Sequence, residues 1–167
     1  LQILLDNQIT KVNIYSTKLR YKIPKKISNI AKNNRILKIY RKGKYILIDL
    51  NNSNSIVIHL GMSGRLKLIK KKNFKKEQHD RFAIETNNFF LILNDIRKFG
   101  LVDILKTANI RNSKLFCHLG IDALDKDLNE EYLHKKINKS IIPIKQILLD
   151  QRIISGIGNI YASEILY

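Results

Sequence analysis

Polar turns divide the first 106 residues of the chain into short segments that are apolar or alternate between apolar and polar side chains. Eight such segments lie at residues 8–16, 36–40, 45–50, 55–60, 65–69, 81–85, 89–93 and 100–105. This alternation is the period of a half-buried strand, and turns at near-regular spacing favour an all-β arrangement. The pattern predicts a β-sandwich or barrel. Pro24 is expected to open one short helix within it, over residues 25–33.

Beyond Lys106 the periodicity changes from that of strands to that of helices. Residues 107–126 are interpreted as a linker, and helical spacing of apolar residues follows from Asp127 to the end of the chain. The sequence therefore predicts an α+β protein. We expect an eight-stranded β-sandwich domain over residues 1–106, a linker over residues 107–126, and a partial helical domain over residues 127–167.

Two apolar runs separated by glycines end the helical region. Gly156, Gly158 and Asn159 stand between a run that stops at Ser155 and a second run that begins with Ile160. Two helices joined by a very short glycine-containing turn are typical of a helix-turn-helix unit. The first N–H groups of the second helix would then face an anion such as a DNA phosphate. On spacing alone, an ordinary αα-hairpin with a glycine cap is the more frequent source of this pattern.

The chain is strongly basic, with 31 Lys and Arg residues against 14 Asp and Glu residues and a net charge of +17. The basic residues are spread throughout the chain, which favours a folded, positively charged face that meets a polyanion. One cysteine excludes an internal disulfide, and Cys117 is expected to be a small buried side chain. No apolar run suits a membrane span and no signal peptide is visible, so we expect a cytoplasmic protein.

Two glycine-flanked positions are candidates for chemistry or binding. Lys44 follows Gly43 at the entrance of a strand, where it either lies at a solvated edge or points at a phosphate or a reacting sugar. Met62 lies between Gly61 and Gly64. It either folds back into the core or acts as an apolar wedge between base pairs, as in proteins that extrude a nucleotide.

A third candidate is the turn over residues 94–100, which carries Arg97 and Phe99. A cation and an aromatic ring on a loop suit hydrogen bonding to bases and stacking on them, although a β-turn with a core phenylalanine explains the turn equally well. His79 precedes another strand and could bond a phosphate. The lysine-rich loop over residues 70–76 is expected to be a solvated tip.

Several of these residues belong to motifs that resemble the formamidopyrimidine-DNA glycosylase family (Fpg, or MutM). The motifs are residues 59–64, 95–100, 148–151 and 156–164, and they stand in the family's order and spacing over nearly the whole chain. The Met-containing loop favours this family over its relative, endonuclease VIII. The resemblance implies a β-sandwich joined to a helix–two-turn–helix domain, with DNA in the cleft between them.

The resemblance also implies a function. Members of this family are bifunctional DNA glycosylase/AP lyases of bacterial base excision repair. They remove oxidised purines, such as 8-oxoguanine and formamidopyrimidines, from double-stranded DNA through a Schiff base and β,δ-elimination. We therefore expect a monomer that acts on the nucleoid and has no membrane partner.

Individual roles follow from the same resemblance. Met62, Arg97 and Phe99 would fill the space of the flipped base, with Arg97 facing the orphaned cytosine. Lys44 would assist the elimination step. Contacts to the DNA backbone would come from His79, Lys145 (the lysine before the first helix of the hairpin), Gly158 and the turn residue Asn159.

The sequence departs from the family pattern at both ends and at three internal positions. The family's N-terminal proline nucleophile and the glutamate after it would lie just before Leu1, and its four-cysteine zinc finger would lie beyond Tyr167. We therefore expect this segment to bind DNA without the nucleophile and without a cofactor. The alternative is a non-catalytic, basic DNA-binding remnant. The internal departures from a usual proline, an arginine and a basic residue are Ile96, Lys98 and Ile141.

Overall fold

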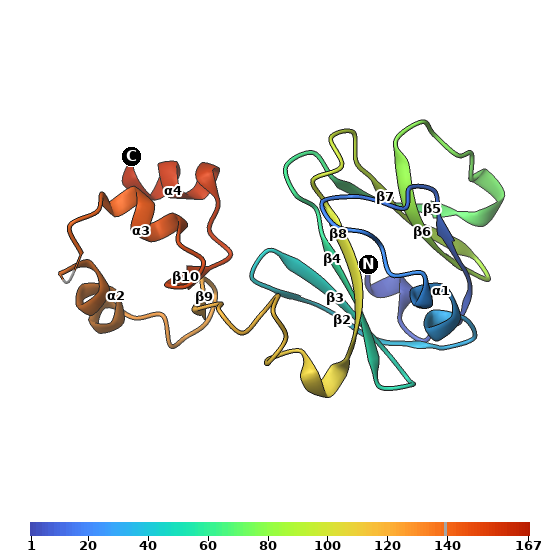
Figure 1. Ribbon diagram of the computed structural model, residues 1–167, viewed down its shortest axis with the longest axis horizontal. Coiled ribbons are helices and arrows are strands. Elements are labelled where there is room, and N and C mark those ends of the chain that lie inside the picture. Colours follow the sequence, from blue (N-terminus) through green and yellow to red (C-terminus); the bar gives the residue numbers. More distant parts are fainter. Residues whose placement is uncertain (139) are drawn as a thin grey trace. The chain divides into compact units, whose positions relative to one another are not determined.

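The computed structural model describes residues 1–138 and 140–167, which form two units (Figure 1). The first unit contains residues 1–41 and 45–109, and the second contains residues 42–44 and 110–167. Residues 107–109 of the expected linker thus fall in the first unit, and residues 110–126 fall in the second. Residues 42–44, at the tip of a hairpin, belong to the second unit, although the chain on either side of them belongs to the first.

Two four-stranded sheets make up the first unit, as the strand pattern predicted. The strands are β1 (Ile9–Ile14), β2 (Ile36–Lys42), β3 (Tyr45–Leu50), β4 (Asn54–His59), β5 (Arg65–Lys70), β6 (Asp80–Thr86), β7 (Phe89–Asn94) and β8 (Leu101–Lys106). One sheet has the order β1-β6-β7-β5 and the other the order β2-β3-β4-β8. In the first sheet β6 pairs antiparallel with β1 and with β7, and β7 pairs antiparallel with β5. In the second sheet β4 pairs antiparallel with both β3 and β8.

The core of the first unit lies between the two sheets. Ile48 and Ile56 of one sheet join Phe82 and Leu91 of the other in a single buried cluster. Strand β4 is buried along nearly its whole length because it lies between β3 and β8, which explains the apolar run at its centre, residues 56–58. Three short helical segments complete this unit: η1 (Gln2–Leu4), α1 (Lys26–Ala31) and η2 (Lys71–Asn73), with a further turn, η3 (Thr107–Asn109), at its end.

The described residues of the second unit form three helices and a small parallel pair of strands. Its elements are β9 (Ile121–Asp122), α2 (Glu130–Ile137), α3 (Ile144–Leu149), β10 (Ile154–Ser155) and α4 (Asn159–Leu166). Strand β10 pairs with β9, an element that the sequence pattern did not predict. The apolar centre of the unit is formed by Leu148, Ile154, Ile157 and Ala162.

The connection between the last two helices is longer than the sequence pattern indicated. The first apolar run was expected to continue as helix to Ser155, but α3 ends at Leu149. The reason lies in the next residues, since Asp150 accepts hydrogen bonds from the backbone and the side chain of Arg152 at 2.9 Å. Such local bonds between side chain and backbone compete with helix formation. Residues 150–158, including β10, therefore join α3 to α4.

Two further observations concern a cysteine and membranes. Cys117 was expected to be buried, but its side chain is exposed. The neighbouring Phe116 is the buried residue of that turn. Among the residues that the structure describes, the helices are too short and too polar to cross a lipid bilayer.

A buried carboxylate at the start of β6 stabilises the first sheet. Asp80 Oδ1 accepts a hydrogen bond from Asn94 at 2.8 Å and lies 3.3 Å from Lys67 Nζ, and Oδ2 accepts from the backbone N–H of Glu77 at 2.8 Å. Burial alone would raise the pKa of this carboxyl group. The hydrogen bonds from Asn94, Glu77 and Lys67 outweigh burial, so the pKa of Asp80 lies below its ordinary value.

We expect Asp80→Asn to lower the free energy of unfolding by about 2–3 kcal/mol at pH 7. One of the groups that donate to the Asp80 carboxylate would then face the NH2 group of the asparagine side chain, which cannot accept a hydrogen bond. A depressed folded-state pKa contributes stability above the unfolded-state pKa, about 3.9, and this stability is lost as pH falls through the folded value. The difference between the variant and the unaltered chain should therefore shrink as the pH falls below the unfolded-state pKa. Urea denaturation over a pH series measures it, with the exposed Asp127→Asn as control. A difference that stays constant with pH would contradict the assignment.

Candidate nucleic-acid interface

The loop that carries Met62 is held in a tight conformation by its glycines. Gly61 has φ of +64°, and a Cβ atom there would lie 2.6 Å from the backbone of Phe99. A Cβ atom at Gly64 would lie 2.2 Å from the carbonyl oxygen of Leu60, so both positions require glycine. The loop leaves Met62 74% exposed, which excludes the alternative that this side chain fills the core.

A single buried carboxylate ties the Met62 loop to the turn over residues 95–100. Asp95 is 0% exposed. Its Oδ1 accepts a hydrogen bond from the hydroxyl of Ser63 at 2.7 Å, and its Oδ2 accepts from the N–H of Gly100 at 2.8 Å. The Ser63 oxygen in turn accepts from the N–H of Arg97 at 3.2 Å. Sequence reasoning missed the roles of Ser63 and Asp95, and an aspartate placed directly after an apolar strand was the only available sign.

Arg97 and Phe99 project from this turn as a stacked pair. The Arg97 guanidinium carbon lies 4.7 Å from the centre of the Phe99 ring, within the range of a cation–π contact. Phe99 is 44% exposed, so it is not the core phenylalanine of the alternative interpretation. Lys98 between them has φ of +59°, and Ile96 is exposed. The two loops therefore bring Met62, Arg97 and Phe99 to the same end of the sandwich.

His79 is connected to the same turn through an arginine. Its Nδ1 atom lies 3.2 Å from a terminal nitrogen of Arg81, and Arg81 Nε donates to the backbone carbonyl of Asp95 at 2.8 Å. The N–H of Asp95 donates to the carbonyl of His79 at 2.9 Å. Arg81 was not singled out from the sequence, where it looked like an ordinary polar position on a strand.

In the second unit, Lys44 lies against the glycine turn before α4. Gly43 has φ of +56°, and its N–H donates to Asp122 Oδ2 at 2.9 Å, which fixes the hairpin tip. The Cε and Nζ atoms of Lys44 each lie 3.7 Å from the position that a Cβ atom would take at Gly158. Partial burial lowers the pKa of the Lys44 ammonium. The structure thus brings together Lys44 and Gly158, which lie far apart in sequence.

Gln151 organises the turn that precedes α4. Its Oε1 accepts from the N–H of Gly156 at 2.9 Å, and its Nε2 donates to the carbonyl of Ile157 at 2.9 Å. Helix α4 then starts with Asn159, so this residue opens the helix and does not lie in the turn itself. Gly158 is the N-cap residue, and no side chain among the described residues caps the first turn of α4. Its leading N–H groups are therefore a suitable place for an anion.

The resemblance implies that Lys145 precedes the first helix of the hairpin, but in the structure Lys145 lies inside α3. Pro143 is the N-cap residue of α3, which begins at Ile144. Lys145 Nζ donates to the hydroxyl of Ser163 on α4 at 3.0 Å, so it connects the two helices. Ile141, where the family has a basic residue, is fully exposed.

Within the part of the chain that the structure describes, no three His, Cys, Asp or Glu side chains gather closely enough to hold a metal ion. The resemblance implies a zinc finger with four cysteines. The exposed Cys117 is the single cysteine of this sequence, so the residues present do not fit that group. No step is assigned to zinc.

We expect Ser63→Ala to loosen the two loops, because it removes both the donor to Asp95 and the acceptor for the Arg97 N–H. Such a loss costs about 1–2 kcal/mol. Native-state hydrogen exchange at the amides of Arg97 and Gly100 measures it, and both should exchange faster than in the unaltered chain. Ser28→Ala is the control, since that hydroxyl makes no hydrogen bond with the described residues. Unchanged exchange at both amides would show that Asp95 does not hold the loops.

Two family models match the chain, one for each region. The formamidopyrimidine-DNA glycosylase N-terminal domain matches residues 1–102, and the formamidopyrimidine-DNA glycosylase H2TH domain matches residues 119–167. The formamidopyrimidine-DNA glycosylase of Rickettsia felis is 41% identical over 165 residues, which are 98% of this chain and 59% of that protein. That of Zymomonas mobilis is 40% identical over 167 residues, 99% of this chain and 61% of the relative. The chain thus spans about 60% of the length of these curated relatives.

Solved structures give the same result. The Lactococcus lactis Fpg protein bound non-covalently to DNA with an AP site has a TM-score of 0.88 and 25% identity, covering 98% of this chain and 63% of that one. The same protein in complex with DNA containing FAPY-dG has a TM-score of 0.89, 25% identity and coverage of 98% and 62%. Since the first family model alone matches more than half of the residues, the chain belongs to the formamidopyrimidine-DNA glycosylase family.

Proposed function

We propose that this chain is the lesion-reading and DNA-binding part of a bifunctional DNA glycosylase/AP lyase, which removes oxidised purines such as 8-oxoguanine and formamidopyrimidines from duplex DNA. It would act as a monomer on the bacterial nucleoid. The observation that carries the proposal is the exposure of Met62, Arg97 and Phe99 on two loops that one buried carboxylate joins. The relatives with solved structures hold DNA with an AP site or with FAPY-dG.

The three exposed side chains have the chemistry needed to replace an extruded nucleotide. Flipping a base costs unstacking free energy, which an inserted apolar side chain offsets by contacting the neighbouring bases. Met62 supplies a flexible apolar wedge, and Phe99 supplies a flat ring that stacks on a base. Arg97 offers a planar fork of donors, which matches the adjacent acceptors N3 and O2 of an unpaired cytosine.

Charge supports contacts to the phosphates. With a net charge of +17, binding should release many counterions and weaken steeply as salt increases. His79 in the first unit is a candidate for backbone contact, as are Lys145 and the start of α4 at Gly158 and Asn159 in the second. Lys44 adds a cation beside that helix start.

The chemistry follows from these positions together with the family's amine nucleophile. A secondary amine attacks C1′ and loses its proton, the glycosidic bond breaks, and the damaged base leaves with its electron pair and takes up a proton. The C1′–O4′ bond then breaks, O4′ takes up a proton, and the opened sugar is left as an iminium at C1′. This iminium acidifies the 2′ proton, and β- and then δ-elimination expel the 3′ and 5′ phosphates. Lys44 would stabilise the negative charge that develops on a leaving phosphate.

We expect Arg97→Ala to abolish the preference for cytosine over adenine opposite a tetrahydrofuran abasic analogue. A good bidentate contact to a base contributes about 1–3 kcal/mol of discrimination, so the preference should fall by roughly 5- to 150-fold. Fluorescence anisotropy with the two duplexes measures it. Arg35→Ala removes an exposed arginine from the same unit and should preserve the preference. An unchanged preference in Arg97→Ala would remove this residue from its assigned role.

We expect Lys44→Ala, in the whole enzyme, to slow strand cleavage of an 8-oxoguanine duplex more than it weakens binding. Because the pKa of Lys44 is lowered, its charge is lost at a lower pH than that of other lysines. The Lys44 contribution should therefore fade as pH rises into the alkaline range, whereas Lys44→Arg should retain it. Denaturing gels give the cleavage rates and anisotropy gives the binding. If the enzyme binds the duplex but never cleaves it, the non-catalytic DNA-binding alternative holds.

A further inference from the structure

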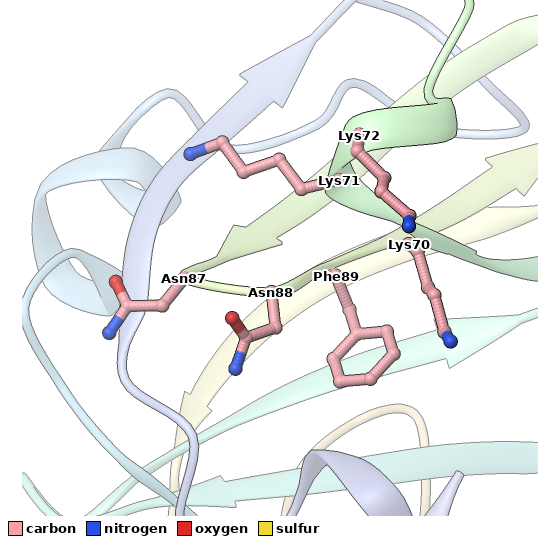
Figure 2. Close-up of a pocket in the computed structure, with 6 residues that line it drawn as sticks. All are labelled: Lys70, Lys71, Lys72, Asn87, Asn88 and Phe89. Carbon is pink, nitrogen blue, oxygen red and sulfur yellow. The ribbon is translucent and has the colours of Figure 1, made fainter.

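A second basic surface lies at the end of β5 and β7 opposite the Met62 loop. Strand β5 pairs with β7 from Arg65 opposite Asn94 to Lys70 opposite Phe89, so the two ends are roughly 17 Å apart. At the Lys70 end an open cavity of about 450 Å³ is present (Figure 2). It is lined by Lys70, Lys71, Lys72, Asn87, Asn88 and Phe89, which we call the lysine cavity.

The lysine cavity has a fixed base. The Thr86 hydroxyl accepts a hydrogen bond from the N–H of Phe89 at 3.1 Å, which closes the turn over residues 87–88. The N–H of Lys71 donates to the carbonyl of Asn88 at 2.7 Å and joins η2 to that turn. The cationic side chains therefore extend from an ordered backbone, which reduces the entropy lost when they bind.

The lysine cavity offers hydrogen-bond donors that are free to bind an anion. Lys71 is paired with Glu85 at 2.5 Å, so its charge is partly balanced. Lys70 and Lys72 make no ion pair within the described residues, and the side-chain amides of Asn87 and Asn88 make no hydrogen bond there. Figure 2 shows the six side chains that line the cavity, with the Phe89 ring between Asn88 and Lys70 in this view. Such a set of donors suits the oxygens of a phosphate group.

The charge continues along the loop beyond the lysine cavity. Five of the seven residues at 70–76 are lysines. Phe74 stacks on Phe90 with ring centres 4.1 Å apart, which holds this loop against β7. A row of cations longer than the cavity matches a strand of successive phosphates better than one isolated anion.

We propose that the lysine cavity is a second DNA-binding site, which contacts the phosphates of a DNA segment other than the one under inspection. The inference rests on the proposed function, since it assumes that DNA occupies the Met62 end. Lys70 lies roughly 17 Å along β5 from the Met62 end, which favours a separate DNA segment at each end. The second segment is bound through its backbone without sequence preference, so the protein can hold a neighbouring stretch of DNA before it leaves the first.

A double variant, Lys70→Gln with Lys72→Gln, tests the inference. The chain is first saturated with an unlabelled duplex that contains the tetrahydrofuran analogue, and a labelled undamaged duplex is then titrated by anisotropy. We expect the double variant to bind the second duplex on the order of tenfold more weakly and with a salt slope lower by about 2. Lys25→Gln with Lys26→Gln removes the same charge from exposed positions in the same unit and should bind both duplexes like the unaltered chain.

The outcomes separate the inference from the proposed function. If the unaltered chain does not bind the first duplex, the proposed function fails. The second site is overturned if the unaltered chain binds the first duplex but not the second. It is also overturned if both double variants lose binding of the second duplex equally. In either case the proposed function stands. If inorganic phosphate competes as effectively as DNA at the same concentration of phosphate groups, the cavity is a small-anion site. If duplex RNA binds more strongly than duplex DNA, the partner is a different one. Either result overturns the DNA assignment.

Discussion

The geometry of the candidate interface depends on the burial of one carboxylate. A buried charge costs several kcal/mol unless hydrogen bonds satisfy it. Asp95 receives these bonds from the Ser63 hydroxyl on one loop and from the Gly100 N–H on its own turn. The carboxylate remains buried only while both loops keep their conformation, and the loops keep it because the carboxylate is there. This mutual dependence couples the conformation of the Met62 loop to that of the turn that carries Arg97 and Phe99.

The second unit uses a neutral side chain for the same purpose. Gln151 has a donor and an acceptor on one amide, and it binds the N–H of Gly156 and the carbonyl of Ile157 together. An amide adds no negative charge beside the start of α4, where a carboxylate would repel a phosphate. Asp95 therefore orders the loops of the proposed base-reading surface, and Gln151 orders the turn beside the proposed phosphate-binding one.

The sequence predicted much of the sandwich because each strand carries its own local signal. Strand β4 could be identified as central from the apolar run over residues 56–58, and Met62 could be identified as unusual from the glycines on both sides. The contacts that fix the site could not be predicted in this way. Ser63 and Asp95 lie 32 positions apart in the sequence. Lys44 and Gly158 are also distant in the sequence and come together only in the folded chain. The early end of α3 depended on a bond between Asp150 and Arg152, which apolar periodicity does not register.

Exposure of the Met62 side chain has a chemical consequence. A thioether in water is open to oxidation, and the sulfoxide turns a flexible apolar group into a polar one. Oxidants that damage guanine can therefore also reach the residue proposed to recognise the gap left by the damaged base. Under the proposed function, a protein that keeps an apolar wedge in solvent would be sensitive to the stress that creates its substrate. Its activity would then depend on how fast methionine sulfoxide is reduced again.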